Sequence, residues 1–203
     1  MVMRTSAPAL LPILRSRVQG DLLALLYLHP DQEYSITDLA ARIGASVKAV
    51  QHEADRLVQC GFLIDRRMGT SRLVRSVRDS VLTEPLTSLL AVTYGPLPVL
   101  TRCLTGVPGV DQAFIYGSWA ARYEGEPGPV PGDVDVLVIG DADPDELDDC
   151  ARSAEVILRR EVNIRRVRPQ AWRGEEDPFL VTVRSRPMVE LRAHPGHGNQ
   201  EAQ

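Results

Sequence analysis

A glycine–serine pair, followed at short range by two alternating aspartates, constrains the fold of this chain more than any other feature. Residues 110–116 predict a strand that ends at Gly117, a helix follows from Ser118, and Asp133 and Asp135 open a second, strongly apolar strand. A glycine lets the backbone approach a ligand closely, and free amides at a helix N-terminus attract phosphate. Residues two apart on a strand point to one face, so we expect the two carboxylates to lie together beside the glycine–serine turn.

Two carboxylates this close repel each other unless a cation lies between them. A magnesium ion, completed by triphosphate oxygens and water, would remove that repulsion. It would also supply the charge neutralisation that phosphoryl or nucleotidyl transfer requires. We therefore expect Mg²⁺ together with a nucleoside triphosphate, as ligand or substrate. Arg122, one turn beyond Ser118, is a further candidate for phosphate contact, with a solvated surface arginine as the alternative.

The glycine–serine pair, the Asp-x-Asp spacing and the apolar continuation DVLVIG resemble the nucleotidyltransferase superfamily that includes DNA polymerase β and the minimal nucleotidyltransferases. The resemblance covers about residues 110–191. It implies that Gly117 and Ser118 hold the nucleotide and that Asp133 and Asp135 bind the metal. The longer string GSWAARYEGEPGPVPGDVDVLVIG is similar to bacterial winged-helix proteins that carry such a domain.

Active members of that superfamily usually place a third carboxylate on a later strand. Here the later strand carries Glu161 and Asn163, which are two apart and therefore share a face. The sequence leaves open which of them occupies the third position. If it is Asn163, that position can neither accept the proton of a nucleophile nor hold a second metal firmly, and turnover would be slow or absent although nucleotide binding could survive.

The N-terminal part has a different pattern. Helices are predicted over residues 18–28, from a cap at Thr37 to a tight turn at Gly44, and over residues 46–60, and a hairpin follows over residues 62–75. The third helix has apolar residues at helical spacing: Val47, Val50, Ala54, Leu57 and Val58. Helix, helix, turn, helix and basic hairpin is the order of a winged helix-turn-helix domain.

A winged helix-turn-helix domain places its third helix in the DNA major groove and its hairpin along the backbone. The side chains expected to read base edges are Ser46, Lys48, Gln51 and His52. Those expected at phosphates are Arg56 and the hairpin arginines Arg66, Arg67, Arg72 and Arg75. The alternative is a winged helix that only docks another protein. The run SITDLAARIGASVKAVQHEADRLVQCGFLIDRR resembles regulators of the ArsR and MarR type, over about residues 18–77.

The charge distribution separates the two halves. Residues 1–80 hold 11 Lys and Arg against 8 Asp and Glu, whereas residues 81–203 hold 12 against 19, for a net charge of −4. An acidic chain does not bind DNA everywhere, so any contact must come from a local basic patch.

These patterns predict an α+β chain of two domains. The domains are a winged helix-turn-helix domain at 1–80, a helical connector at 81–107, a nucleotidyltransferase-like α/β domain with a mixed sheet and flanking helices at 108–192, and a disordered tail at 193–203.

The three cysteines, Cys60, Cys103 and Cys150, are far apart and form no CxxC pair. That spacing argues against a disulfide framework or a zinc site and favours core thiols in a reducing cytoplasm. No apolar run is long enough for a membrane span.

Three functions follow as hypotheses. The first is a cytoplasmic transcription regulator that binds double-stranded DNA and senses a nucleotide. The second is a Mg²⁺-dependent nucleotidyltransferase, similar to antitoxins of that type, that transfers a nucleoside monophosphate to a protein, RNA or small-molecule hydroxyl. The third is a non-catalytic antitoxin that blocks a toxin-like partner by contact. A homodimer through residues 10–28 or 82–104 is expected for the winged helix.

Overall fold

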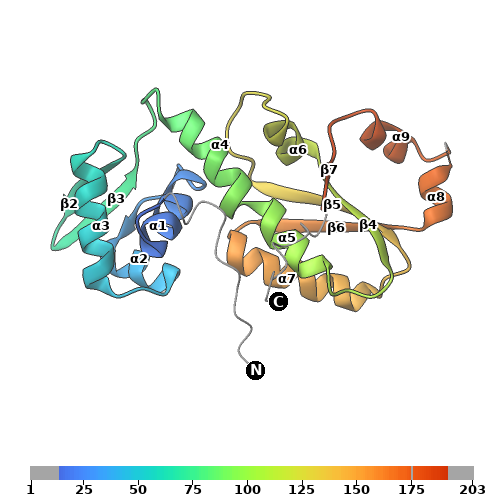
Figure 1. Ribbon diagram of the computed structural model, residues 1–203, viewed down its shortest axis with the longest axis horizontal. Coiled ribbons are helices and arrows are strands. Elements are labelled where there is room, and N and C mark those ends of the chain that lie inside the picture. The colour runs from blue at the N-terminus through green and yellow to red at the C-terminus, as the bar shows by residue number, and fades with distance from the viewer. Residues whose placement is uncertain (1–13, 175, 192–203) are drawn as a thin grey trace, which may run out of the picture. The chain divides into compact units, whose positions relative to one another are not determined.

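The computed structural model describes residues 14–174 and 176–191 (Figure 1). The chain divides into two compact units, with the division between Gly95 and Pro96. Unit 1 contains α1 (Arg17–Tyr27), β1 (Tyr34–Ser35), α2 (Ile36–Ile43), α3 (Val47–Gln59), β2 (Leu63–Met68), β3 (Ser71–Ser76) and α4 (Thr83–Tyr94). Unit 2 contains α5 (Pro96–Leu104), β4 (Val110–Tyr116), α6 (Gly117–Tyr123), β5 (Asp133–Gly140), α7 (Pro144–Leu158), β6 (Glu161–Val167), α8 (Pro169–Arg173), α9 (Pro178–Arg184) and β7 (Val189–Glu190). The predicted tail at 193–203 lies outside the described residues.

Serine caps start the first three helices of unit 1. The hydroxyl of Ser16 accepts a hydrogen bond from the amide of Gln19, and Ser35 and Ser46 do the same at α2 and α3. The expectation that Thr37 caps α2 was wrong. Ser35 precedes the helix in extended conformation, and its hydroxyl accepts a hydrogen bond from the amide of Asp38 at 3.1 Å. Gly44 ends α2 with φ +66, a conformation that glycine adopts without steric cost.

The core of unit 1 lies where α1, α2 and α3 meet. Leu22, Leu26 and Leu39 are fully buried there, together with Val50 and Ala54 of α3. The helical spacing predicted for α3 is therefore confirmed at its centre. Its first apolar position is not part of the core, because the side chain of Val47 is 48% exposed.

The hairpin predicted over residues 62–75 is confirmed in unit 1. β2 and β3 pair antiparallel, with Met68 opposite Ser71, and Gly69 turns the chain with φ +60. β1 pairs with the other side of β3, which gives a small sheet in the order β1-β3-β2. This order of helices and strands is that of a winged helix-turn-helix domain, with α3 as its third helix and β2–β3 as its wing.

Unit 2 is built on a mixed four-stranded sheet in the order β6-β5-β4-β7. β5 and β6 run parallel through the crossover helix α7, while β4 is antiparallel to both β5 and β7. Leu137 and Ile139 of β5 pack on Leu180 and Val183 of α9. Residues 134, 136 and 138 point to the opposite face and are fully buried. The mixed α+β architecture agrees with the prediction.

The two helices of the predicted connector, residues 81–107, pack in different units. α4 packs against α1 in unit 1, and α5 packs against α7 in unit 2. Gly20 of α1 makes the first contact possible, because a side chain there would meet the hydroxyl of Tyr94 in α4.

The cysteines differ from expectation. Cys103 of α5 and Cys150 of α7 form a disulfide with a Cα–Cα distance of 5.6 Å, and Cys60 is exposed. The prediction of three core thiols was therefore wrong. Spacing in the sequence could not reveal the pair. The two cysteines are 47 residues apart, and they meet only because α5 packs on α7 in the folded unit. Within residues 14–174 and 176–191, each helix is too short or too polar to span a bilayer.

Candidate functional sites

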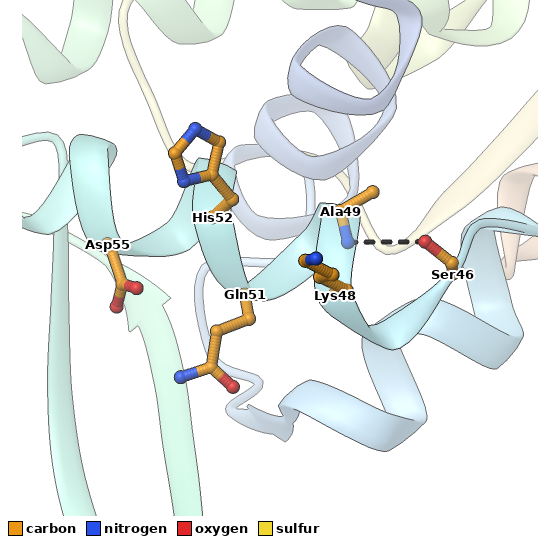
Figure 2. Close-up of a pocket in the computed structure, with 6 residues that line it drawn as sticks. All are labelled: Ser46, Lys48, Ala49, Gln51, His52 and Asp55. Carbon is orange, nitrogen blue, oxygen red and sulfur yellow. Dashed lines mark hydrogen bonds between the residues drawn. The ribbon is translucent and has the colours of Figure 1, made fainter.

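The outer face of α3 carries the predicted base-reading side chains. Lys48, Gln51 and His52 are exposed and line a shallow depression with Ser46, Ala49 and Asp55 (Figure 2). Ser46 accepts a hydrogen bond from the amide of Ala49 at 3.2 Å, which fixes the start of the helix. Lys48 is the only lysine of the chain. A polar outer face opposite an apolar inner face leaves this side of α3 available to a ligand.

The inner face of α3 contains a charge that the sequence analysis missed. Glu53 is only 6% exposed, and its carboxylate accepts hydrogen bonds from the guanidinium of Arg15 and, at 3.1 Å, from the hydroxyl of Ser16. These contacts join α3 to the start of α1. A glutamate three residues after Val50, within the apolar stripe, was the signal that could have revealed it.

The four wing arginines do not lie in equivalent environments. Arg66 pairs with Glu33, and this hydrogen bond lowers the pKa of the Glu33 carboxyl. Arg72 is 18% exposed and binds two carboxylates, those of Asp55 and Asp65. Arg67 is exposed and Arg75 is half-buried. Arg56 of α3 is exposed as expected for a phosphate contact.

In unit 2, strand register brings the predicted polar residues together. Asp133 lies opposite Glu161 on β6, and Asp135 lies opposite Asn163. The Asp135 carboxylate also lies beside the glycine–serine turn, since its Oδ2 is 2.9 Å from the position that a Cβ of Gly117 would occupy. Gly117 has φ +71, so a side chain at this position would be both strained and crowded. The expected proximity of aspartate and turn is present.

The surroundings of Asp135 explain its electrostatics. Burial raises the pKa of this carboxyl, and repulsion from Asp133 and Glu161 raises it further. A hydrogen bond from the amide of Asn163 acts in the opposite direction and lowers it. Neighbouring negative charges thus disfavour the ionised form of Asp135, and the neutral amide of Asn163 partly offsets their effect.

Ser118 and Arg122 both lie on α6. Ser118 is exposed, and α6 begins at Gly117, one residue earlier than predicted. The guanidinium of Arg122 donates to the carbonyl of Glu126 and packs against Gly128. Arg122 therefore holds the loop between α6 and β5 in its present conformation. In the part of the chain that the structure describes, no group of three or more His, Cys, Asp or Glu is arranged to hold a metal ion.

An aromatic wall borders the carboxylates and was not foreseen. Tyr116 lies opposite Asp135, and the ring of Phe179 meets it edge-on at a centroid distance of 5.8 Å. The guanidinium of Arg165 lies 3.8 Å from the centroid of Phe179 and pairs with Asp177 at 3.5 Å. Burial and the neighbouring Asp135 raise the pKa of the Tyr116 phenol.

By its order of elements, unit 1 is a winged helix-turn-helix domain, and unit 2 is a mixed-sheet α/β domain. Solved structures similar to this chain include reduced HlyU from Vibrio cholerae, with 20% identity over 41% of this chain and 82% of that chain and a TM-score of 0.34. The adhesin competence repressor AdcR from Streptococcus pyogenes shares 23% identity over 44% and 66% of the two chains, with a TM-score of 0.35. The heme sensor protein PefR from Streptococcus agalactiae, in complex with heme, shares 19% identity over 45% and 60%, with a TM-score of 0.32.

No family model matches the chain, and no curated protein matches it. The assignment of unit 1 to the winged-helix fold therefore depends on its own elements: three helices, the Gly44 turn between α2 and α3, and the β2–β3 wing.

Proposed function

We propose that this protein is a DNA-binding transcription regulator. In this proposal α3 enters the major groove and the β2–β3 wing follows the sugar-phosphate backbone. The observation that carries the proposal is the division of α3 into two faces: Val50 and Ala54 are fully buried, while Lys48, Gln51 and His52 are exposed on the other side. Amide and ammonium groups at the start of such a helix suit base edges and phosphates better than an apolar protein partner.

The proposal includes that the protein acts as a homodimer in the cytoplasm. Two winged helices related by a two-fold axis read two half-sites of a palindrome. Two segments were expected to mediate dimerisation. In the described part of 10–28, residues 22–28 are buried, so these side chains are not available for contact with a second copy. α4 instead leaves Leu89 and Val92 about half exposed, which supports the segment 82–104 as the dimer contact.

The proposal is tested by selection from random DNA duplexes, which is expected to enrich a sequence motif. Lys48→Ala and Gln51→Ala are each expected to weaken binding of that motif by about 5- to 150-fold, because a good base contact contributes about 1–3 kcal/mol. The matched control is Arg173→Ala, which removes one exposed cation from unit 2 and is expected to bind as the wild type does. Failure to enrich any motif, or equal binding by all three variants, would contradict the proposal.

A second candidate function is nucleotide sensing by unit 2. The observation that favours it is the Asp135 carboxylate beside Gly117, with Asp133, Glu161 and Asn163 on the same face. Carboxylate oxygens are the ligands that Mg²⁺ prefers, and the mutual repulsion of these groups is what a cation would relieve, so the donor set fits the ion chemically. Asp133 and Asp135 would hold Mg²⁺, and Gly117 and Ser118 would contact the phosphates of the nucleotide. Bound there, the ion would neutralise phosphate charge.

The neutral amide of Asn163 opposite Asp135 favours sensing over transfer. The alternative within this candidate is transfer of a nucleoside monophosphate to a protein, RNA or small-molecule hydroxyl, with Glu161 as the remaining carboxylate. A toxin-like protein partner would be one such acceptor.

Asp135→Asn is expected to make unit 2 more stable at neutral pH while abolishing its response to nucleotide. The folded-state pKa of Asp135 is raised, so ionisation of this carboxyl opposes folding. The penalty is complete above the folded-state pKa and disappears as the pH falls from that value to the unfolded-state pKa. We expect a gain below about 1 kcal/mol, since the carboxyl is only partly buried. The measurement is urea unfolding followed by tryptophan fluorescence, and separately the shift in thermal midpoint with Mg²⁺ and each of the four ribonucleoside triphosphates.

The control for that variant is Asp148→Asn, which neutralises an exposed aspartate of α7. It is expected to keep both the wild-type stability and the nucleotide response. If the wild type shows no thermal shift with any Mg²⁺–nucleotide, and transfers no label from labelled triphosphates, nucleotide sensing and nucleotidyl transfer are both rejected.

A further inference from the structure

We infer that Arg72 and Arg66 position the wing and that Arg67 contacts DNA phosphate. This inference depends on the proposed DNA binding of unit 1. It divides residues of one chemical type into two roles, which the arginine-rich sequence of the hairpin does not do.

Arg72 lies between the wing and α3. Its Nε is 2.5 Å from Oδ2 of Asp65 on β2, and its Nη1 donates to Asp55 on α3. The side chain is 18% exposed, whereas Asp55 is 48% exposed on the same face of α3 as the depression that Lys48 lines. Arg72 thus ties the hairpin to the helix proposed to read the DNA.

The charge balance at this cluster argues against a phosphate contact by Arg72. One guanidinium faces two carboxylates, so the cluster of Arg72, Asp55 and Asp65 carries a net negative charge. To reach a phosphate, Arg72 would have to leave both carboxylates unpaired beside the polyanion. Its contribution is to shield the two aspartates and to hold the wing, and its loss would leave their charges facing the DNA.

Arg66 has a similar role on the other face of the hairpin. Successive residues of a strand point to opposite faces, so Arg66 lies away from Asp65 and Arg67. Its guanidinium makes two hydrogen bonds to the carboxylate of Glu33, just before β1, with Nε at 3.0 Å. A paired arginine fork of this kind fixes both partners in orientation. The wing is therefore held on both of its faces.

Arg67 is different. It lies directly opposite Arg72 in the β2–β3 register, one residue before the turn, and it is exposed. Like charges opposite each other across a hairpin repel, and the pairing of Arg72 with two aspartates removes most of that cost. Among the described residues, no side chain or carbonyl forms a hydrogen bond or ion pair with Arg67. Its charge is available to a phosphate.

The test compares salt dependence. For DNA binding by the full chain, each phosphate contact contributes about 0.9 to the slope of log affinity against log salt concentration. Arg67→Met is expected to lower the slope by about 1 and to weaken all sequences alike. Arg72→Met is expected to weaken binding, but the triple variant Arg72→Met/Asp55→Asn/Asp65→Asn is expected to recover the wild-type slope and affinity to within about threefold. A triple variant that keeps a slope deficit of about 1 would overturn the inference.

A second measurement needs no DNA. In hydrogen exchange of the free protein, Arg72→Met is expected to speed exchange of the amides at residues 63–76, while Arg67→Met leaves them unchanged. Equal exchange in both variants would show that Arg72 does not hold the wing. If the wild type binds no DNA while the exchange result is as expected, the proposed function and the role of Arg67 fail together, whereas the positioning role of Arg72 stands.

Discussion

Gly140→Ala is expected to lower the free energy of unfolding of unit 2 by about 3 kcal/mol or more. Gly140 ends β5 with φ +145, a conformation that residues with a side chain rarely adopt. A Cβ there would overlap the carbonyl oxygen of Gly109 and lie 3.0 Å from the amide nitrogen of Asp111. That carbonyl is fixed, because it accepts a hydrogen bond from the amide of Asp141 at 2.9 Å. Relief of this overlap would require a shift of backbone atoms, which costs free energy in the folded state.

The measurement is urea unfolding of the full chain followed by tryptophan fluorescence. The chain has two tryptophans, Trp119 and Trp172, and both belong to unit 2, so the signal reports on that unit alone. The matched control is Gly106→Ala between α5 and β4, where a Cβ would meet no atom within 4 Å and the backbone is not in the left-handed region. It is expected to stay within about 0.5 kcal/mol of the wild type. Equal unfolding midpoints for the two variants would contradict the role assigned to Gly140.

The features that could be read from the sequence are those with a short-range cause. The turn at Gly44, the Gly69 hairpin and the buried centre of α3 each follow from residue types within a few positions. The Asp133 and Asp135 pair was also predictable, because alternation alone puts both on one face of β5. Even at short range a choice between neighbours failed: Ser35 and Thr37 are both good caps, and only the backbone conformation selects Ser35.

The features that could not be predicted depend on contacts between distant segments. The wing arginines look alike in the sequence, and their partners Asp55 and Glu33 come from outside the hairpin. The burial of Glu53 depends on Arg15, 38 positions away. The choice between Glu161 and Asn163 was open because it depends on the β5–β6 register, which the length of the α7 crossover does not determine. That register puts the amide, rather than the carboxylate, opposite Asp135.

Reduction of the Cys103–Cys150 disulfide is expected to lower the free energy of unfolding of unit 2 by about 2 to 4 kcal/mol. The bond closes a loop with a sequence separation of 47 residues, so its loss returns considerable conformational freedom to the unfolded chain. In the folded unit the two cysteines join α5 to α7, the helix that connects β5 to β6. Cys150 is 4% exposed, so a reductant reaches the pair mainly through the Cys103 side.

The measurement is again urea unfolding by tryptophan fluorescence, with and without a thiol reductant. Cys103→Ser is the control, because it removes the disulfide but keeps the exposed Cys60, so its unfolding midpoint is expected to ignore the reductant. Thiol titration in denaturant is expected to find one reactive thiol in the oxidised protein and three after reduction. Three thiols before reduction, or a wild-type midpoint that does not respond to reductant, would show that α5 and α7 are held together by packing alone.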